Sequence, residues 1–403
     1  MAVLILFSIT SCKDKPVEAP HVHEWDEGTV TTPSTCIKEG VRTFKCTGCD
    51  ETRTEPIAKL SHSFDETTGK CSICQGYKAG DNVAAVYDST EKTLLVTGSG
   101  DMTDYTYDST AKKITAPWAE DDVTKVIIDD GVTSVSNNAF YGMDKITDVI
   151  IGKDVKSIKH YTFYGCSSLE NLTFADGSAL ETIGFYSFYK CKALKSINLS
   201  EGLVTIGPYA FNYTAIEVFD IPASLDFSKS AAFWNPDKLT AVNVDVGNTS
   251  AKSVDGVVYS IDGKTVIGVP ANKTGYTIPS EVEAIGSYAF SCWNGTTITI
   301  PGRVKTIGQG AFYYTDITSI ELPESVTSIG MNAFQDCHSL LSVDIKSTQV
   351  NAIGQNAFLT CTALKSIRIN MPESAKATLD TKNNNWSAPT AATVTWYGTE
   401  STT

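Results

Sequence analysis

A small residue followed by phenylalanine recurs through most of this chain at nearly constant spacing. The pairs are Ala139-Phe140, Thr162-Phe163, Ser187-Phe188, Ala210-Phe211, Ala232-Phe233, Ala289-Phe290, Ala311-Phe312, Ala333-Phe334 and Ala357-Phe358. Successive pairs are 22 to 25 residues apart, except for one step of 57 residues. Repeats of this length bury their apolar sides only against neighbouring repeats. The spacing therefore predicts a solenoid of stacked coils.

Each repeat also carries the pattern of a short strand. In residues 182–199, TIGFYSFYKCKALKSINL, the residues Ile197 and Leu199 alternate with Ser196 and Asn198. Such alternation predicts a strand with one buried face, here within residues 194–199. We expect the Ile-Gly pair to mark the returning segment, with Gly207 letting the backbone turn where a side chain would clash. Ten coils spaced by about 4.8 Å predict a parallel sheet about 50 Å long.

The outward strand positions form the candidate binding surface. They are mostly small, polar and weakly acidic: Asn171, Thr173, Ser196, Asn198, Asp220, Asn243, Thr299, Ser319, Glu321, Ser342, Asp344 and Arg368. An extended surface of this kind suits a protein or a glycan. The alternative is that these side chains only solvate the sheet, and the few aromatic residues among them count against sugar stacking.

The repeat unit L-x-x-I-x-I-P-x-x-V-x-x-I-G-x-x-A-F-x-x-C closely resembles the BspA-like leucine-rich repeats of bacterial surface antigens. The resemblance covers roughly residues 120 to 372. It implies a leucine-rich repeat solenoid, with a parallel β-sheet on one side and short turns or helical segments on the other. It also implies surface display, binding to proteins or glycans, and no catalytic residue. Because proline, as in Pro301 and Pro323, often follows the strand, no asparagine ladder is expected.

Four cysteines share one position of the repeat, namely Cys166, Cys191, Cys337 and Cys361. Adjacent coils bring Cys166 near Cys191 and Cys337 near Cys361, at a separation compatible with disulfides. Parallel side chains in one column usually remain packed thiols. We therefore expect buried free thiols at these positions.

A second group of cysteines lies upstream of the repeats. Cys46 and Cys49 form one C-x2-C pair, and Cys71 and Cys74 form another after 21 intervening residues. Two such pairs at this separation predict a closed, structural zinc site with four thiolate ligands. A short polar segment with little core needs such a cross-link to fold. Residues 20–79 are thus predicted to hold structural zinc.

Three further residues are possible additional ligands, namely Cys36, His23 and His62. With them the segment also reads as two imperfect units, each His-x-aromatic followed by Cys-x-x-Cys, and resembles the small zinc-ribbon-like modules of bacterial surface proteins. Disulfides are the open alternative, because an exported protein meets oxidising conditions. A catalytic zinc is not expected, since the chain contains no H-E-x-x-H motif.

The first residues resemble a bacterial lipoprotein signal. Ala2 to Ile9 form an apolar run too short to span a bilayer, and Thr10-Ser11-Cys12 resembles a lipobox. The resemblance implies lipidation of Cys12 and export to the outer membrane or cell surface, although no Lys or Arg precedes the apolar run. Membrane contact is expected only through this anchor.

The sequence suggests five regions. Residues 1–19 form the signal and tether, 20–79 the Cys/His-rich module, 80–121 a β-rich N-terminal cap, 122–372 the repeats and 373–403 a C-terminal cap. Residues 247–275 interrupt the repeats, and Asp262-Gly263 between apolar runs predicts a hairpin there.

Function follows from the repeats alone, because no nucleophile, phosphate or dinucleotide motif is present. The net charge of −14 argues against nucleic-acid partners. We expect a surface protein that is not an enzyme and mediates adhesion by binding a host or extracellular protein, or a glycan. The alternative is capture of glycan or peptide for nutrient uptake.

Overall fold

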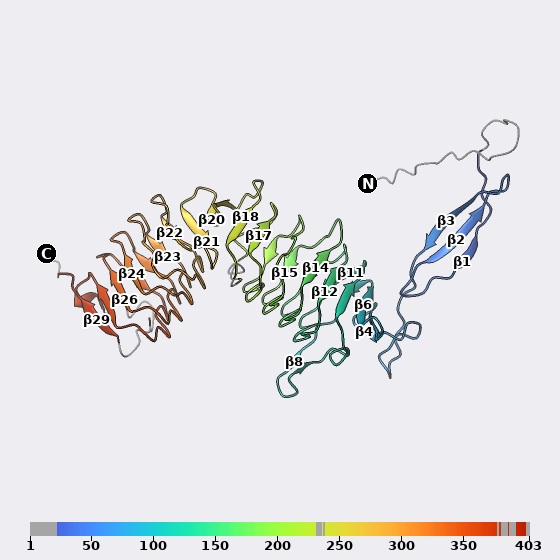
Figure 1. Ribbon diagram of the computed structural model, residues 1–403, viewed down its shortest axis with the longest axis horizontal. Helices are drawn as coiled ribbons and strands as arrows, with labels where there is room; N and C mark the ends of the chain where they lie inside the picture. The colour runs from blue at the N-terminus through green and yellow to red at the C-terminus, as the bar shows by residue number, and fades with distance from the viewer. Residues whose placement is uncertain are drawn as a thin grey trace. The chain divides into compact units, whose positions relative to one another are not determined.

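The computed structural model describes residues 22–230, 236, 238–376, 379, 386 and 392–399 (Figure 1). It contains two compact units, Met1–Lys78 and Ala79–Thr403. The predicted lipidation site Cys12 and the pair Ala232-Phe233 lie outside the described residues.

Unit 1 is a small β-structure with very little apolar core. Strands β1 (Thr29–Thr32), β2 (Gly40–Lys45) and β3 (Thr52–Ile57) form an antiparallel sheet in that order, and β4 (Tyr77–Lys78) ends the unit. Within residues 22–78, the buried apolar side chains are Phe44 and the cysteines Cys36, Cys46 and Cys71. Hydrophobic burial alone therefore contributes little to the stability of this unit.

Unit 2 is the predicted solenoid, and one limb of its coils carries strands, on what we call the strand side (Figure 1). The strands are parallel and in register, so that Val126, Val149 and Leu172 are neighbours across three coils. They are β10 (Lys125–Ile128), β12 (Asp148–Ile151), β14 (Asn171–Phe174), β17 (Val218–Ile221), β18 (Ala241–Val244), β24 (Ser319–Leu322), β26 (Ser342–Ile345), β28 (Ser366–Ile369) and β29 (Thr393–Trp396).

The sequence predicted one continuous parallel sheet, but the strand side is divided. Its strands form three groups, which end at β14, at β18 and at β29. Residues 194–199, expected to be a strand, belong to none, although Ile197 and Leu199 are buried and Ser196 and Asn198 are exposed. Alternating burial is thus retained there without the strand's hydrogen-bond pattern.

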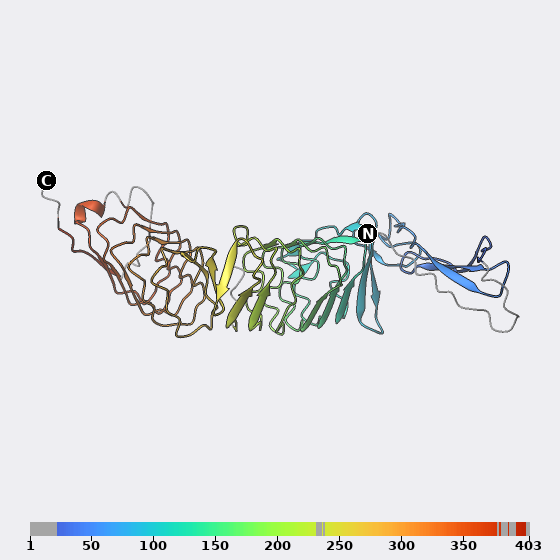
Figure 2. The ribbon, with the colours of Figure 1, turned by 90° about the horizontal axis from the view of Figure 1, so that it is seen from above.

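A second ladder of short strands runs along the opposite limb of the coils, which we call the return side. Figure 2 shows the strand side and the return side apart, in the view from above. One sheet contains β7 (Gly100–Asp101), β11 (Val132–Val135), β13 (Ser157–Ile158), β15 (Thr182–Ile183) and β16 (Thr205–Ile206). The other contains β21 (Thr265–Gly268), β22 (Ala284–Ile285), β23 (Thr306–Ile307), β25 (Ser328–Ile329) and β27 (Ala352–Ile353).

The phenylalanines of the repeat form stacked columns inside the coils. Phe188 is fully buried, and its ring centroid lies 5.3 Å from those of both Phe163 and Phe211. A second column joins Phe290, Phe312, Phe334 and Phe358 at 5.0 to 5.4 Å. The backbone N–H of Phe188 donates to the Ala210 carbonyl of the next coil at 2.8 Å, and the same bond to the next coil recurs at Phe163, Phe312 and Phe334. This position therefore supplies both core volume and a hydrogen-bond ladder.

The clash expected at the glycine of the recurring Ile-Gly pair is confirmed at Gly207. A Cβ on Gly207 would lie 2.5 Å from the backbone nitrogen of Phe185 in the preceding coil, and its φ is not left-handed. Glycine is needed because the backbones of successive coils touch here and leave no room for a side chain.

Left-handed residues lie two positions after the phenylalanine, as at Lys190 and Tyr213, and also two positions before it. Tyr186, Tyr209 and Tyr288 have φ of 55 to 58° there. This conformation is uncommon for residues other than glycine.

Hairpins border the first coil and interrupt the stack. β5 (Val83–Asp88) pairs antiparallel with β6 (Thr93–Gly98), and β6 continues the sheet of the strand side beside β10. Trp118 is fully buried at the end of the phenylalanine column and donates from Nε1 to the Ala139 carbonyl at 2.9 Å. The remaining short elements are β8 (Tyr107–Asp108), β9 (Lys113–Ile114) and the 3₁₀ turn η1 (Glu373–Ala375).

Two hairpins build the interruption. β19 (Ala251–Val254) and β20 (Val257–Ser260) are joined by Asp255-Gly256, both with positive φ, and β20 pairs antiparallel with β21. The predicted hairpin at Asp262-Gly263 is confirmed as the second of these, and Asp255-Gly256 is a further turn of the same chemistry.

Candidate metal centre and binding surface

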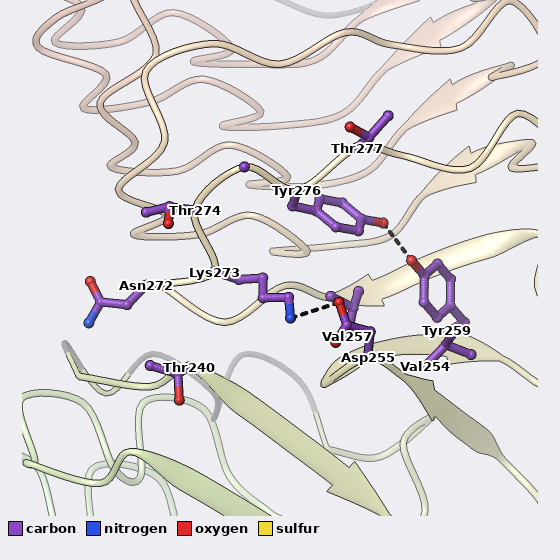
Figure 3. Close-up of a pocket in the computed structure, with 11 residues that line it drawn as sticks. Thr240, Val254, Asp255, Val257, Tyr259, Asn272, Lys273, Thr274, Tyr276 and Thr277 are labelled. Carbon is purple, nitrogen blue, oxygen red and sulfur yellow. Dashed lines mark hydrogen bonds and ion pairs between the residues drawn. The ribbon is translucent and has the colours of Figure 1, made fainter.

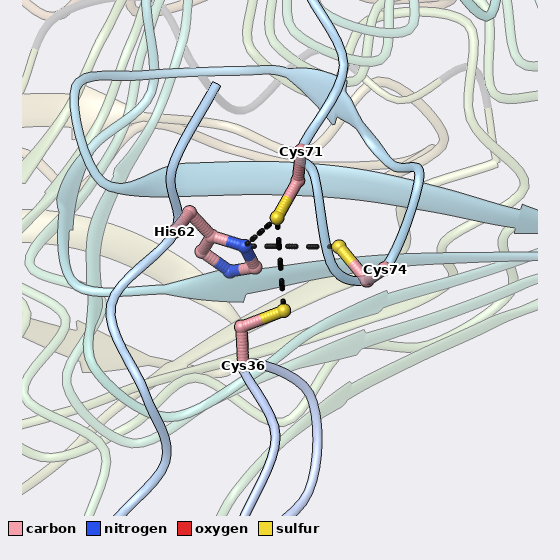
Figure 4. A group of neighbouring side chains, drawn as sticks. All are labelled: Cys36, His62, Cys71 and Cys74. Atoms are coloured by element: carbon pink, nitrogen blue, oxygen red, sulfur yellow. Dashed lines mark hydrogen bonds between the residues drawn. The ribbon is translucent and has the colours of Figure 1, made fainter. Parts of the chain in front are cut away.

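Four side chains of unit 1 that could hold a metal ion converge on one point (Figure 4). They are Cys36, His62, Cys71 and Cys74, whose ligand atoms all lie within 4.8 Å of one another. The sulfurs of Cys36 and Cys71 are 3.7 Å apart. The Nδ1 atom of His62 lies 3.5 Å from the Cys71 sulfur and 3.7 Å from the Cys74 sulfur.

These distances match the edges of a tetrahedral zinc site. Zinc bonds of about 2.3 Å to sulfur and about 2.0 Å to nitrogen give sulfur–sulfur edges of about 3.8 Å and sulfur–nitrogen edges of about 3.5 Å. The chemistry also fits, since three thiols and one imidazole are a typical set of structural zinc ligands. The four residues together fill a tetrahedron and leave no position for a substrate.

Local backbone structure presents these ligands. The Cys71 N–H donates to the Gly76 carbonyl, and the Gln75 N–H donates to the Cys71 carbonyl, both at 2.9 Å. Gln75 has a φ of 60°, which closes the turn that carries both thiols. Phe64 forms an antiparallel bridge with Cys71 and stacks on His62 with ring centroids 5.7 Å apart. The aromatic residue thus fixes the imidazole beside the thiols.

A second cluster repeats this arrangement. The Nδ1 atom of His23 lies 3.4 Å from the Cys46 sulfur and 3.5 Å from the Cys49 sulfur. Trp25 bridges Cys46 and stacks on His23 with centroids 5.3 Å apart, as Phe64 does in the first cluster. The described residues bring three ligands together here. Glu51 approaches the other ring nitrogen of His23 at 3.8 Å.

Protonation in the first cluster is uneven. Burial raises the pKa of the Cys71 thiol, but hydrogen bonds from the backbone and from His62 outweigh it and lower this pKa to about 6. Burial, with the neighbouring thiols of Cys36 and Cys71, raises the pKa of Cys74 to about 12. Without a cation, the three crowded thiols therefore favour one thiolate among them. A metal ion would stabilise the other two as thiolates as well.

The single four-thiolate site expected from Cys46, Cys49, Cys71 and Cys74 is not what the structure brings together. The two C-x2-C pairs belong to different clusters, and each pair is completed by a histidine. The 21 residues that separate the two pairs along the chain include strand β3, and the pairs do not meet. The second reading of the sequence, two units each with His-x-aromatic and Cys-x-x-Cys, describes the grouping better, and Cys36 joins the second unit.

The four cysteines that share one position of the repeat are buried thiols outside disulfides, as predicted. Each donates to a phenylalanine carbonyl of the preceding coil, at 3.2 Å from Cys166 and Cys191 and at 2.9 Å from Cys337 and Cys361. The shared position therefore provides a weak donor for a carbonyl that faces the core.

The predicted binding surface lies on the strand side. Its members are exposed except for the half-buried Ser342 and Asp344: Asn171, Thr173, Ser196, Asn198, Asp220, Asn243, Thr299, Ser319, Glu321, Ser342, Asp344 and Arg368. Those on strands form columns, for example Glu321, Asp344 and Arg368. Ser196, Asn198 and Thr299 lie on segments that are not strands.

Several of these side chains bond to one another across coils. Arg368 contacts Asp344 at 3.2 Å, and the Asn243 amide donates to Asp220 at 2.8 Å. The Asn171 amide donates to Asp148 at 2.8 Å. The surface is therefore polar, partly cross-linked and preformed.

Tyrosine rows outside the strand side were missed by the sequence analysis. Tyr141 stacks on Tyr164 with centroids 4.5 Å apart, and Tyr164 stacks on Tyr189 at 4.9 Å. Tyr161 likewise stacks on Tyr186 at 5.3 Å. The signal was available, because each of these residues recurs at the period of the repeat. Their faces are occupied by one another, so the rows mainly stabilise the stack.

Comparison with known proteins identifies the repeat. The profile of the BspA type leucine-rich repeat region, in six copies, matches residues 118–240 and 271–378, which is more than half of the chain. The protein belongs to the BspA type leucine-rich repeat family. Members of this family are repeat proteins that generally act by binding rather than by catalysis. No curated protein matches the chain as a relative.

Several solved structures are similar to this BspA type chain. A leucine-rich repeat protein from Eubacterium ventriosum ATCC 27560 is 26% identical, with 73% of this chain and 77% of that chain covered and a TM-score of 0.64. The pneumococcal vaccine antigen PcpA is 19% identical over 79% and 98%, with a TM-score of 0.48. A leucine rich cell surface protein from Faecalibacterium prausnitzii A2-165 is 20% identical over 77% and 97%, with a TM-score of 0.47.

Within the residues that the structure describes, no helix is both long and apolar enough to cross a membrane.

Proposed function

We propose that this BspA type protein is displayed on the cell surface and binds a host or extracellular macromolecule through the strand side of its repeats, in adhesion. The observation that carries the proposal is the row of outward polar side chains, which recur in register from coil to coil. Such a row offers an extended, preformed surface, and repeat proteins use surfaces of this kind for binding.

The test is binding of the whole protein to immobilised extracellular-matrix proteins. Thr173→Arg combined with Asn198→Arg places two long cations on the exposed strand side. Thr348→Arg combined with Thr362→Arg makes the same change at exposed residues outside the strand side. We expect the first pair to weaken binding at least about tenfold, or 1.4 kcal/mol, and the second to leave it unchanged. Equal effects of both pairs would contradict the strand-side assignment.

A second candidate function is capture of glycan or peptide for nutrient uptake. Two cavities rich in hydroxyl groups, on the strand side near residues 272–299, favour this reading. Cells that lack the protein distinguish the two functions. Loss of adherence with normal growth supports adhesion, whereas loss of growth on one polymer with normal adherence supports capture.

Attachment to the membrane through lipidated Cys12 is part of the proposal, supported by the Thr10-Ser11-Cys12 sequence after an apolar run. Labelling with a fatty-acid analogue in the native host tests it. We expect the label on the wild type and its loss in Cys12→Ala. Equal labelling of both proteins would exclude Cys12 as the lipidated residue.

We infer that unit 1 holds structural zinc. The cluster of Cys36, His62, Cys71 and Cys74 supplies four ligands, so its coordination is closed and the ion has a structural role. Because Phe44 is the one buried apolar side chain other than cysteine within residues 22–78, the ion would replace the missing core.

Zinc content of the purified protein tests this inference. We expect about two zinc ions per chain, one for each cluster, and about one in His62→Ala. His338→Ala, which changes an exposed histidine of the repeats, should leave the content unchanged. Zinc-free protein whose Cys46, Cys49, Cys71 and Cys74 resist alkylation until reduced would support disulfides instead.

A further inference from the structure

Two neighbouring cavities open where the strand side is broken between β18 and β24. The first has a volume of about 540 Å³ and lies between the hairpin β19–β20 and residues 272–277 (Figure 3). The second, of about 460 Å³, lies between residues 274–277 and residues 293–299. Residues 274–277 line both cavities. Both volumes are within the range of ligand pockets, roughly 300–1,000 Å³.

The repeat explains why there is space here. Tyr276-Thr277-Ile278 and Ile298-Thr299-Ile300 occupy the strand position of their coils, with Ile278 and Ile300 buried as elsewhere. Neither segment forms a strand, so the sheet that would close this region is missing. The cavities are therefore openings in the strand side at the site of the interruption.

The lining is rich in groups that both donate and accept hydrogen bonds. It contains hydroxyl and amide side chains from both cavities: Thr240, Asn272, Thr274, Thr277, Asn294, Thr296, Thr297 and Thr299. A ligand with many hydroxyls of its own matches such a lining. Tyr276 adds an aromatic ring to both cavities, which suits the apolar face of a sugar.

Contacts among the lining residues hold the cavities in shape. The hydroxyls of Tyr259 and Tyr276 are 2.7 Å apart, as Figure 3 shows. Trp293 donates from Nε1 to the Lys273 carbonyl at 2.9 Å, and the Asn294 amide donates to the Asn272 side-chain oxygen at 2.6 Å. A ligand would thus meet a preformed site and would lose less free energy to ordering it.

Charge restricts the ligand further. The charged side chains of the first cavity, Lys273 and Asp255, pair at 2.9 Å (Figure 3). The second cavity is lined by no charged residue within the described part of the chain. Because the protein carries a net charge of −14, an anionic ligand would also be repelled.

We propose that these two cavities form one binding site for a neutral oligosaccharide, with sugar units on either side of residues 274–277. The proposal rests on the glycan-capture role above and names its site and ligand class. The outward strand positions lack an aromatic residue for stacking on a sugar. Tyr276, with the threonines around it, supplies that contact from the interruption.

Calorimetric titration of the whole protein with neutral tetrasaccharides tests the site. The probes are cellotetraose, maltotetraose, xylotetraose and mannotetraose, with tetragalacturonic acid as the anionic comparison. Thr274→Trp fills the shared edge of both cavities, and Thr348→Trp makes the same change at an exposed threonine away from them.

We expect saturable binding of at least one neutral probe and at least about tenfold weaker binding in Thr274→Trp, with Thr348→Trp like the wild type. Thr274 is exposed, so the substitution should leave folding intact, which a circular dichroism spectrum checks.

Three results would overturn the proposal. They are silence of all neutral probes at millimolar concentration, equal weakening by Thr348→Trp, and tighter binding of the anionic probe. Growth loss on a polymer in cells that lack the protein, together with silent probes, would retain the capture role and remove this site. Probe binding together with normal growth on every polymer would retain this site and remove the capture role.

Discussion

Replacing Gly330 by alanine tests whether contact between backbones of successive coils fixes the repeat. A Cβ at this position would lie 2.6 Å from the Gln309 nitrogen, 2.6 Å from the Gly308 carbonyl carbon and 2.7 Å from the Gly308 oxygen. All three are backbone atoms, so no side chain can rotate away. The coils must separate by roughly 0.8 Å to bring this Cβ to an ordinary contact distance of 3.4 Å, which forces overpacking strain of about 1–3 kcal/mol.

The same separation lengthens a hydrogen bond. The Gly330 N–H donates to the Ile307 carbonyl at 2.8 Å, and its weakening costs up to about 1 kcal/mol more. We therefore expect Gly330→Ala to lower the free energy of unfolding of unit 2 by about 2–4 kcal/mol.

Urea unfolding of the whole protein, followed by circular dichroism, measures this change. The matched control is Gly302→Ala, where no atom lies within 4 Å of the new Cβ and the φ is not left-handed. That substitution should be neutral or stabilising by up to about 1 kcal/mol, because it restricts the unfolded chain. Equal stability of the two variants would refute the close-contact explanation.

Three further predictions concern the core, the surface charges and unit 1. Phe334→Ala should destabilise unit 2 by about 3–5 kcal/mol in the same titration, whereas Tyr314→Ala, at a half-exposed ring, should cost under about 1 kcal/mol. Hydrogen bonds from Lys264 and Lys305 lower the pKa of Glu283 from 4.5 to about 2. Because the folded pKa lies below the unfolded one, the stability advantage over Glu283→Gln should be full above pH 4.5 and vanish as the pH falls towards 2, in urea titrations across this range. Removing metal with a chelator should expose residues 22–78 to limited proteolysis and leave residues 79–376 protected; unchanged protection of both would contradict the metal-dependent fold.

The solenoid could be predicted from the sequence because its signal is repeated and physical. Phe188 and Phe334 occupy the same position in different coils, and only stacking of coils buries both. The strand breaks could not be predicted. Residues 194–199 have the same alternation as β26, and their departure from strand geometry is not visible in residue types.

The candidate metal centre was predicted in its residues but not in its grouping. Spacing along the chain favoured Cys46, Cys49, Cys71 and Cys74 together, because two C-x2-C pairs are a common ligand pattern. The grouping is decided instead by antiparallel bridges, Trp25 with Cys46 and Phe64 with Cys71, which place each histidine beside the nearest pair. Cys36 joins through the loop between β1 and β2, a contact that no local pattern specifies.

The two units depend on different sources of stability, which bears on how the protein works. Each coil of unit 2 contributes a buried phenylalanine and hydrogen bonds to its neighbours, so stability accumulates along the stack and tolerates an interruption such as β19–β20. Unit 1 has Phe44 and a few thiols in place of a core, so the metal proposed for it would stabilise its fold. A change in metal supply would then alter unit 1 while the strand side keeps its shape. Binding through the repeats should accordingly persist in chelator, whereas any role of unit 1 should be lost.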